Sequence, residues 1–253
     1  MDFFWNTVET IDRSRCDGFS HFDTSHMEWL VLFLCFAFVC MVIYLKAGSG
    51  RKNIRRGLAV LMIADEILKY IIVAANGISV LAYLPLQLCS ISVIIVILHA
   101  LFAPTGWHQN VFSRYAGNFL YLIGLPAGLS ALLFPAWTSL PAFANLMSIH
   151  SFSVHIMIVT YVVVLLVAEE IRPEIKTTPV NICVLIAMAI GVYYFDVKFG
   201  MNYMYLVHLS PASPLAPFAA LGDYRIGYAV ILAALVLVLY GLPAVFRRGR
   251  RRG

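Results

Sequence analysis

Charged residues are scarce in this sequence. Asp, Glu, Lys and Arg make up 12% of its 253 residues, whereas 61% are hydrophobic. Soluble domains are about one quarter charged and about half apolar. With a mean hydropathy of +0.85, the chain has too few polar side chains to cover a water-exposed globule. The composition excludes an ordinary soluble protein and predicts a polytopic membrane protein with one membrane domain.

Paired cysteine motifs and a cleavable signal peptide are also missing. The five cysteines are odd in number and form no CxxC pair, so neither a disulfide framework nor a zinc site is indicated. Cys35, Cys40 and Cys183 have apolar neighbours and are expected to be small buried hydrophobes. The first 25 residues carry five acidic side chains and lack the basic and apolar regions of a signal peptide. The first span should therefore act as its own insertion signal.

Seven apolar runs are long enough to cross a bilayer as helices. We predict an all-α, seven-helix transmembrane bundle with spans at residues 27–47, 58–82, 84–103, 115–136, 145–168, 180–197 and 226–246. Residues 1–26 should form a short polar extracytoplasmic segment, residues 27–246 the membrane domain and residues 247–253 a basic cytoplasmic tail. Pro211, Pro214 and Pro217 exclude a continuous helix from the loop at 198–225.

The basic residues predict the orientation. Seven spans would place 13 Lys and Arg residues on one side, five of them in the tail, and 4 on the other. Because the richer side is normally cytoplasmic, we expect the N-terminus outside a plasma membrane or bacterial inner membrane and the C-terminus in the cytoplasm. The basic residues flank apolar runs rather than share one soluble surface, so the net charge of +5 does not predict a nucleic-acid partner.

Polar side chains inside spans are candidates for function, because burying a charge in a bilayer is costly. In the second span Asp65 and Lys69 lie four residues apart on one face, with Glu66 beside them. The favoured interpretation is a self-neutralising pair. The alternative is a pathway through a non-catalytic transporter or receptor-like protein. In the fourth span Gly124 and Gly128 have the spacing of close helix packing.

A thiol and imidazoles gather toward the outer side. Pro85 suits the first turn of a helix, which would place Cys89 a little over one turn below the surface. At 1.5 Å per residue, His150 of the fifth span should lie near the depth of Cys89, with His155 deeper. The two histidines point about 140° apart, so only one should face the thiol.

A cysteine beside a histidine is the minimum machinery of nucleophilic acyl transfer, because the imidazole can take the thiol proton and return it to the leaving group. His26, at the start of the first span, adds a third imidazole, so a metal-dependent hydrolase that uses His26, His150 and His155 as ligands stays open. Asn202 and Tyr203, after the sixth span, either roof the Cys89 niche or anchor the loop at the headgroups.

The order of these pieces resembles the YwaF family, which includes transmembrane protein 164, from about residue 19 to residue 246. The matching pieces are FDTSH at 22–26, LPLQLC at 84–89, the stretch 124–135, His155 and MNYMYL at 201–206. The resemblance implies a seven-helix bundle whose animal members are cysteine-dependent acyltransferases that move a fatty acyl chain between phospholipids, including onto lyso ether lipids. It implies Cys89 as the acyl-accepting nucleophile and His155 as its base. Where family members often have a histidine two residues before the cysteine, this chain has Gln87.

We therefore predict an acyltransferase, or a lipase-like hydrolase, that acts on glycerophospholipid acyl esters through a thioester on Cys89. His155 is the favoured base and His150 the alternative. Membrane phospholipids are the expected substrates, and the chemistry requires no metal or organic cofactor. Ser90, Ser92 and Asn202 are candidate donors to the oxyanion. The candidate substrate-binding residues are His26, Gln87, Ser90, Ser92, Asn118, Asn202 and Tyr203.

Overall fold

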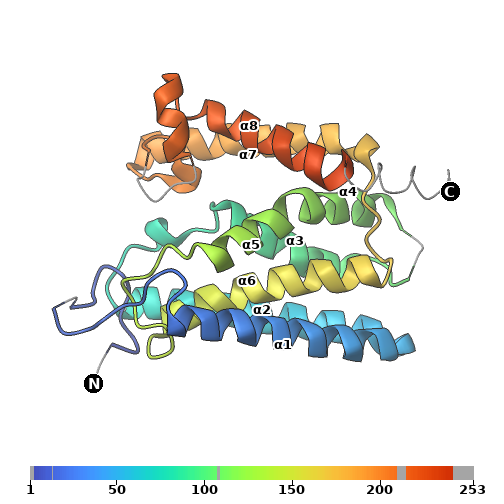
Figure 1. Ribbon diagram of the computed structural model, residues 1–253, viewed down its shortest axis with the longest axis horizontal. Helices are drawn as coiled ribbons and strands as arrows, with labels where there is room; N and C mark the ends of the chain where they lie inside the picture. The colour runs from blue at the N-terminus through green and yellow to red at the C-terminus, as the bar shows by residue number, and fades with distance from the viewer. Residues whose placement is uncertain (1–2, 13, 107–108, 210–214, 242–253) are drawn as a thin grey trace. The chain divides into compact units, whose positions relative to one another are not determined.

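The computed structural model is all-α (Figure 1) and describes residues 3–12, 14–106, 109–209 and 215–241. The chain divides into two compact units, residues 1–173 and 174–253. In the described part, the first unit holds α1 (Thr24–Lys46), α2 (Arg51–Ala75), α3 (Leu88–Phe102), α4 (Val111–Phe119), α5 (Leu125–Leu133) and α6 (Leu146–Val167). The second unit holds α7 (Thr178–Phe199) and α8 (Ile226–Val236).

The described residues form seven long helices, because a π-helical segment, η3 (Leu120–Gly124), joins α4 and α5 into one helix. Likewise η7 (Leu237–Gly241) extends α8. Short 3₁₀ helices occur at η1 (Gly48–Gly50), η2 (Val80–Tyr83), η4 (Ile175–Thr177), η5 (Tyr203–Tyr205) and η6 (Ala216–Leu221). The predicted all-α class is confirmed.

Four helices of the described part are long and apolar enough to cross a membrane, at residues 24–46, 111–133, 146–167 and 175–199. α3 and the α8–η7 helix are apolar but shorter, and α2 carries seven charged residues. The side chains that α1 exposes are mostly apolar; Leu34 and Phe38 are each more than 60% exposed, which lipid contact explains. The protein is an integral membrane protein, and the seven spans and their orientation stay predictions.

Three predicted helix boundaries, in two helices, are wrong. α2 starts at Arg51 rather than residue 58 and stops at Ala75, where Gly77 takes a positive φ of 69° and donates its amide hydrogen to the Ala74 carbonyl. A left-handed glycine just past the last turn is a common helix stop. α3 starts at Leu88 rather than residue 84. Pro85 disfavours the helical conformation for Leu84, and the N-cap residue Gln87 has an extended backbone.

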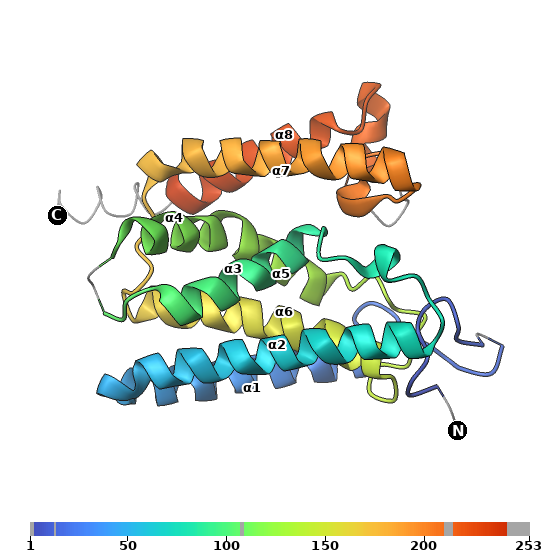
Figure 2. The same ribbon diagram turned by 180° about the vertical axis from the view of Figure 1, so that it is seen from behind.

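Residues 3–12 and 14–23 form a folded cap. Ile11 is buried in a cluster with Ile72, Val73, Leu140 and Met147. These neighbours come from the end of α2, the α5–α6 loop and the start of α6, so the predicted polar segment covers one end of the first unit (Figures 1 and 2). We name this the capped end, and we name the opposite end of the unit, where α2 starts, the Arg55 end.

Buried charges hold the Arg55 end together. The Arg55 guanidinium donates to the carbonyl oxygens of His99 and Ala103 at 2.6 and 3.0 Å, in and just after the last turn of α3. It also pairs with the Glu170 carboxylate at 3.2 Å, and the Tyr44 hydroxyl donates to that carboxylate at 2.7 Å. The network links α1, α2 and α3 to the chain just past α6, and neither member of the Arg55–Glu170 pair was identified from the sequence as a buried charge.

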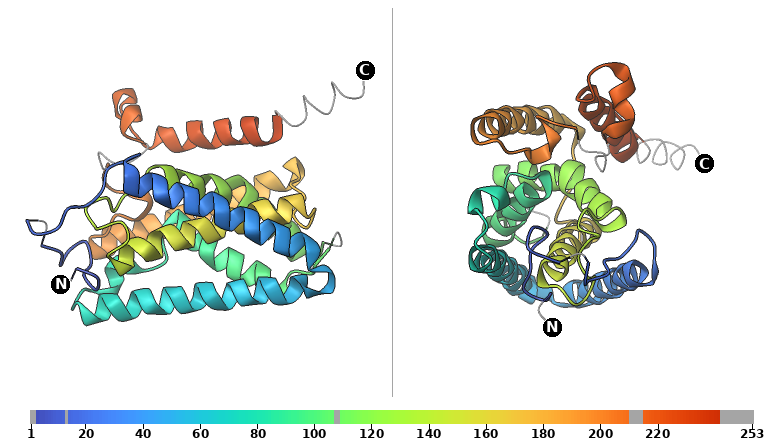
Figure 3. Two further views of the ribbon diagram at one scale, coloured as in Figure 1. Left: turned by 60° about the horizontal axis from the view of Figure 1, so that its bottom comes forward. Right: turned by 90° about the vertical axis from the view of Figure 1, so that its left-hand side faces the viewer.

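α6 is the central helix of the first unit. It packs against α1, α2, α3 and α5 (Figure 3). A Cβ atom added at Gly128 of α5 would lie 2.8 Å from Cγ2 of Val159 in α6, and one at Gly124 would lie 3.4 Å from Oγ of Ser92 in α3. The predicted close packing at these glycines is confirmed, since small residues let helix backbones approach each other.

Some predictions fall outside the described residues. They concern Arg13, Pro211, Pro214, the end of the seventh span at 242–246 and the basic tail at 247–253.

Candidate functional site

Cys89 lies in the first turn of α3, whose N-cap residue is Gln87. The residue is partly exposed, and its thiol interacts with the backbone amides of Cys89 and Ser90. The first amides of a helix have no intrahelical acceptor and form the positive end of its dipole. This position is one of those that favour a reactive thiolate.

His155 of α6 is the histidine beside this thiol. The two side chains are near enough to interact electrostatically. Nδ1 of His155 is 2.6 Å from the Ser151 carbonyl oxygen, which can only accept, so Nδ1 carries a proton. Nε2 is buried and has no formed hydrogen bond in the described part of the chain. Because catalytic hydrogen bonds are often loose without substrate, this geometry suits a resting Cys–His pair.

The prediction that His150 lies at the depth of Cys89 is wrong. The count of 1.5 Å per residue does not apply before Leu88, because residues 84–87 form a turn and not a helix. His155, nine residues into α6, lies about 13 Å from the start of that helix.

His150 faces α2 instead. Its Nδ1 lies 2.7 Å from Oδ2 of Asp65, and its Nε2 lies 3.9 Å from Oε1 of Glu66. Lys69 pairs with Glu66 and not, as predicted, with Asp65. The spacing within α2 cannot reveal this exchange of partners, because the competing group comes from another helix. The four side chains are at most 20% exposed.

His26 is fully buried and uses both ring nitrogens in hydrogen bonds. Nδ1 accepts from the Phe22 amide at 2.8 Å, and Nε2 donates to the Leu132 carbonyl at 2.7 Å. His26 links the start of α1 to the end of α5. Both of its ring nitrogens are used in these hydrogen bonds, so neither is available for the expected role in substrate or metal binding. Among the described residues, no group of three or more His, Cys, Asp and Glu side chains is placed to hold a metal ion.

The other candidates in the first unit are dispersed. The Ser92 hydroxyl is buried and donates to the Leu88 carbonyl at 2.9 Å, so its proton is committed within α3. Asn118 is buried in α4. The Gln87 side chain does not cap α3.

Asn202 and Tyr203 belong to the second unit. The Asn202 side chain accepts from the Val207 and His208 amides at 3.2 and 3.0 Å and donates to the His208 carbonyl. It thereby fixes the loop after α7, and Tyr203 is buried there. Their predicted place over Cys89 stays a prediction.

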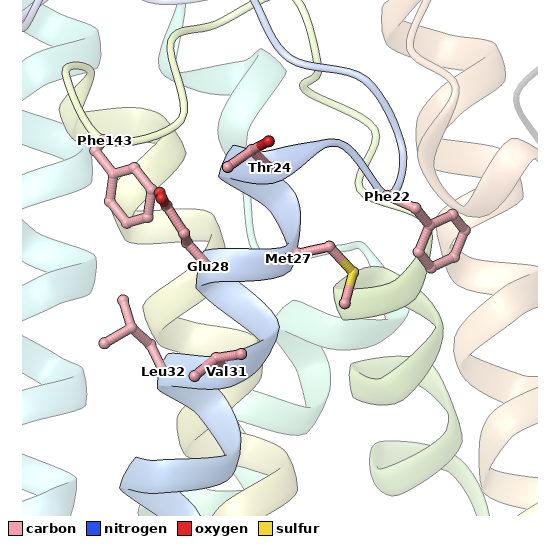
Figure 4. Close-up of a pocket in the computed structure, with 7 residues that line it drawn as sticks. All are labelled: Phe22, Thr24, Met27, Glu28, Val31, Leu32 and Phe143. Atoms are coloured by element: carbon pink, nitrogen blue, oxygen red, sulfur yellow. The ribbon is translucent and has the colours of Figure 1, made fainter.

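A shallow groove of about 690 Å³ lies along the first turns of α1. Figure 4 shows Glu28 and Phe143 together at one edge of this groove and Met27 and Phe22 toward the other. Neither Cys89 nor His155 lines it, so the Cys–His pair and this groove are separate features.

Sequence reasoning also missed the Ser151 carbonyl, because it is a backbone group and carries no residue-type signal.

Comparison with known proteins gives one result: the TMEM164 family model matches residues 21–242. No curated protein and no solved structure is significantly similar. The matched range starts before α1, includes Cys89 and His155, and extends beyond α8. The chain belongs to the TMEM164 family.

Proposed function

We propose that this protein is a membrane-embedded, cysteine-dependent acyltransferase that acts on the acyl esters of glycerophospholipids. The observation that carries the proposal is the pairing of Cys89, at the N-terminus of α3, with the imidazole of His155. The resemblance to animal acyltransferases of the family supports the same assignment.

In the first half-reaction, Nε2 of His155 takes the proton of the Cys89 thiol. The sulfur attacks the acyl carbonyl carbon and forms a tetrahedral intermediate. When the ester C–O bond breaks, the lysophospholipid oxygen leaves with the proton that His155 returns. The products are a thioester on Cys89 and a lysophospholipid.

In the second half-reaction, the hydroxyl group of a lysophospholipid gives its proton to His155 and attacks the thioester. The C–S bond breaks, the proton returns to the sulfur and the acyl chain is on the new lipid. If water attacks instead, the product is a free fatty acid. A site within the bilayer contains little water, which favours transfer over hydrolysis.

Two local features support these steps. The Ser151 carbonyl holds a proton on Nδ1 of His155, so the neutral ring presents a lone pair at Nε2 to the thiol. The amides of the first turn of α3, at Cys89 and Ser90, are donors beside the reacting sulfur. Such donors stabilise a developing oxyanion without reorganisation during the reaction.

The direct test measures products. The purified protein in liposomes is given a phospholipid with a deuterated acyl chain and an unlabelled lysophospholipid, and lipid mass spectrometry follows the label. Wild type and Cys183→Ala, a cysteine replacement in α7, should transfer the label, whereas Cys89→Ser and Cys89→Ala should not. Full transfer by Cys89→Ala would refute the mechanism. Absence of transfer by wild type, with ion flux that depends on Asp65 and Glu66, would favour the transporter alternative.

A further inference from the structure

The side chains of residues 65–70 in α2 connect to both elements that carry the Cys–His pair. Toward α6, Asp65 lies 2.7 Å from His150. Toward the chain that leads into α3, the Tyr70 hydroxyl donates to the Tyr83 carbonyl oxygen at 3.2 Å. Tyr83 is the last residue of η2 and lies six residues before Cys89.

The Asp65–His150 contact fixes the rotation of α6. His150 and His155 are five residues apart, so their directions differ by about 140° around the helix axis. If His150 points at Asp65 on α2, His155 must point away from α2, and in this structure it meets Cys89. A rotation of α6 by one residue position, about 100°, would break both contacts together.

The charges around His150 make this contact specific. The charged groups that face it come from α2: Asp65 at Nδ1 and Glu66, 3.9 Å from Nε2. Lys69 balances Glu66 and lies over the Tyr70 ring, 4.6 Å from its centroid. A hydrogen bond to a carboxylate is about twice as strong as one between two neutral groups, so the carboxylate of Asp65 is the preferred acceptor for His150.

We infer that Asp65, His150 and Tyr70 are positioning residues for the Cys89–His155 pair. Asp65 and His150 set the rotation of α6, and Tyr70 holds the segment that precedes α3. Through these contacts α2 aligns the nucleophile and the base without touching the acyl ester. The inference rests on the proposed function. It also assigns a role to the charges of α2 that had been interpreted as scaffold or as a transport pathway.

The test measures the reactivity of Cys89 toward N-ethylmaleimide from pH 5 to pH 9, in full-length protein whose other four cysteines are replaced by alanine. The thiolate is the reacting form, so the pH profile reports the coupling between Cys89 and His155. This coupling is first established with His155→Ala, which should slow labelling at pH 7 by about tenfold.

Asp65→Leu and His150→Leu should each slow labelling by about as much as His155→Ala and shift the pH profile in the same way. The double variant should be no slower than either single one, because the two residues act as a unit. Asp65→Asn keeps an acceptor for Nδ1 and should restore labelling to within about threefold of wild type. Tyr70→Phe should slow it by about threefold. In the transfer assay these variants should lower kcat with KM unchanged.

Tyr44→Phe is the matched control, because it also removes one hydroxyl that donates a hydrogen bond, but at the Arg55 end. It should lower thermal stability without a change in the labelling profile. Wild-type profiles for folded Asp65→Leu and Tyr70→Phe would overturn the inference while the Cys–His pair stands. If His155→Ala itself labels like wild type, the proposed function fails first.

Discussion

Nδ1 of His155 donates a hydrogen bond to the carbonyl oxygen of Ser151, 2.6 Å away and one turn earlier in α6. A side chain is thus oriented by the backbone of its own helix. The bond leaves Nε2 unprotonated on the neutral ring, and the Cys89 thiol lies in reach of this side chain. The imidazole can therefore accept the thiol proton without changing tautomer.

Removal of the His155 imidazole should lower the rate of thioester formation more than it lowers the affinity for the donor lipid. We expect His155→Ala to lower the rate of acyl transfer by about 100-fold, because positioned general bases contribute about 10²- to 10⁴-fold. The measurement is the rate of label transfer at saturating donor lipid. His21→Ala, at a histidine in the cap, is the control and should retain the rate. A His155→Ala rate within twofold of wild type would remove the base from the mechanism.

The buried charges at the Arg55 end should stabilise the fold rather than the reaction. Glu170→Leu leaves Arg55, which is 2% exposed, without its counter-ion, and breaking a buried pair in this way costs about 3–5 kcal/mol. Thermal unfolding in detergent micelles should show a large fall in Tm. Glu169→Leu is the matched control, because Glu169 forms an exposed pair with Arg172 and should change Tm little. Equal shifts for both variants would contradict the assignment.

Gly128 should not tolerate a side chain. In Gly128→Ala the new Cβ would lie 2.8 Å from Cγ2 of Val159, and such overpacking costs about 1–3 kcal/mol. The second substitution Val159→Ala removes the clashing methyl groups and should recover part of the lost Tm. Gly191→Ala in α7, where a Cβ would meet no atom within 4 Å, should leave Tm unchanged or raise it slightly, because Ala favours a helix more than Gly does. A neutral Gly128→Ala would show that α5 and α6 are less closely packed.

The cap should depend on Asn145, the N-cap residue of α6. Its side chain accepts from the Met147 and Ser148 amides and donates to the carbonyl oxygens of Phe3 and Asn6 at 2.6 and 2.9 Å. Asn145→Ala should cost about 1 kcal/mol for the lost helix cap and also loosen residues 3–23.

Limited trypsin digestion at Arg15 measures that loosening, and cleavage should be faster in Asn145→Ala than in wild type. Asn110→Ala is the matched control, since Asn110 caps α4 in the same way without a contact to the cap. If both variants are cleaved at the wild-type rate, Asn145 does not hold the segment.

Asp23 should make stability depend on pH in the acid range. Its carboxylate accepts from the Ser20 and His26 amides at 2.7 and 2.9 Å, and these hydrogen bonds hold the pKa of Asp23 below its ordinary value. A lowered folded-state pKa means that the stabilisation is present above the unfolded value of about 3.9 and is lost as the pH falls through the folded value.

Asp23→Asn keeps an acceptor but not the charge. The Tm difference between wild type and this variant should therefore be constant from pH 7 to about pH 5 and shrink below about pH 4. A difference that stays constant to pH 3 would exclude this charge from the cap of α1.

The sequence predicted the helices better than their contacts. Apolar runs located the seven long helices of the described residues. Polar groups are costly in lipid, so the segments that cross a membrane have apolar sequences that can be recognised. The start of α3 was misplaced by four residues, because a proline fits both the first turn of a helix and the chain before it. Partners between helices, such as His150 with Asp65, depend on how each helix is rotated, and a single sequence does not contain that rotation.

The candidate site shows the same limit. Cys89 and His155 were named from residue type and resemblance. The roles of His26 and Ser92 were not predicted, because each bonds to a backbone carbonyl. Such acceptors exist at every position and leave no pattern in the side chains.

The central claim is a thioester on Cys89, and intact-protein mass spectrometry tests it most directly. Detergent-purified wild type and Cys89→Ala are mixed with phospholipids and quenched at times from milliseconds to minutes. The expected result is a mass increase of one acyl chain on wild type alone, removed by hydroxylamine. An adduct of equal size on Cys89→Ala, or none on wild type while labelled lipid is being transferred, would contradict the claim.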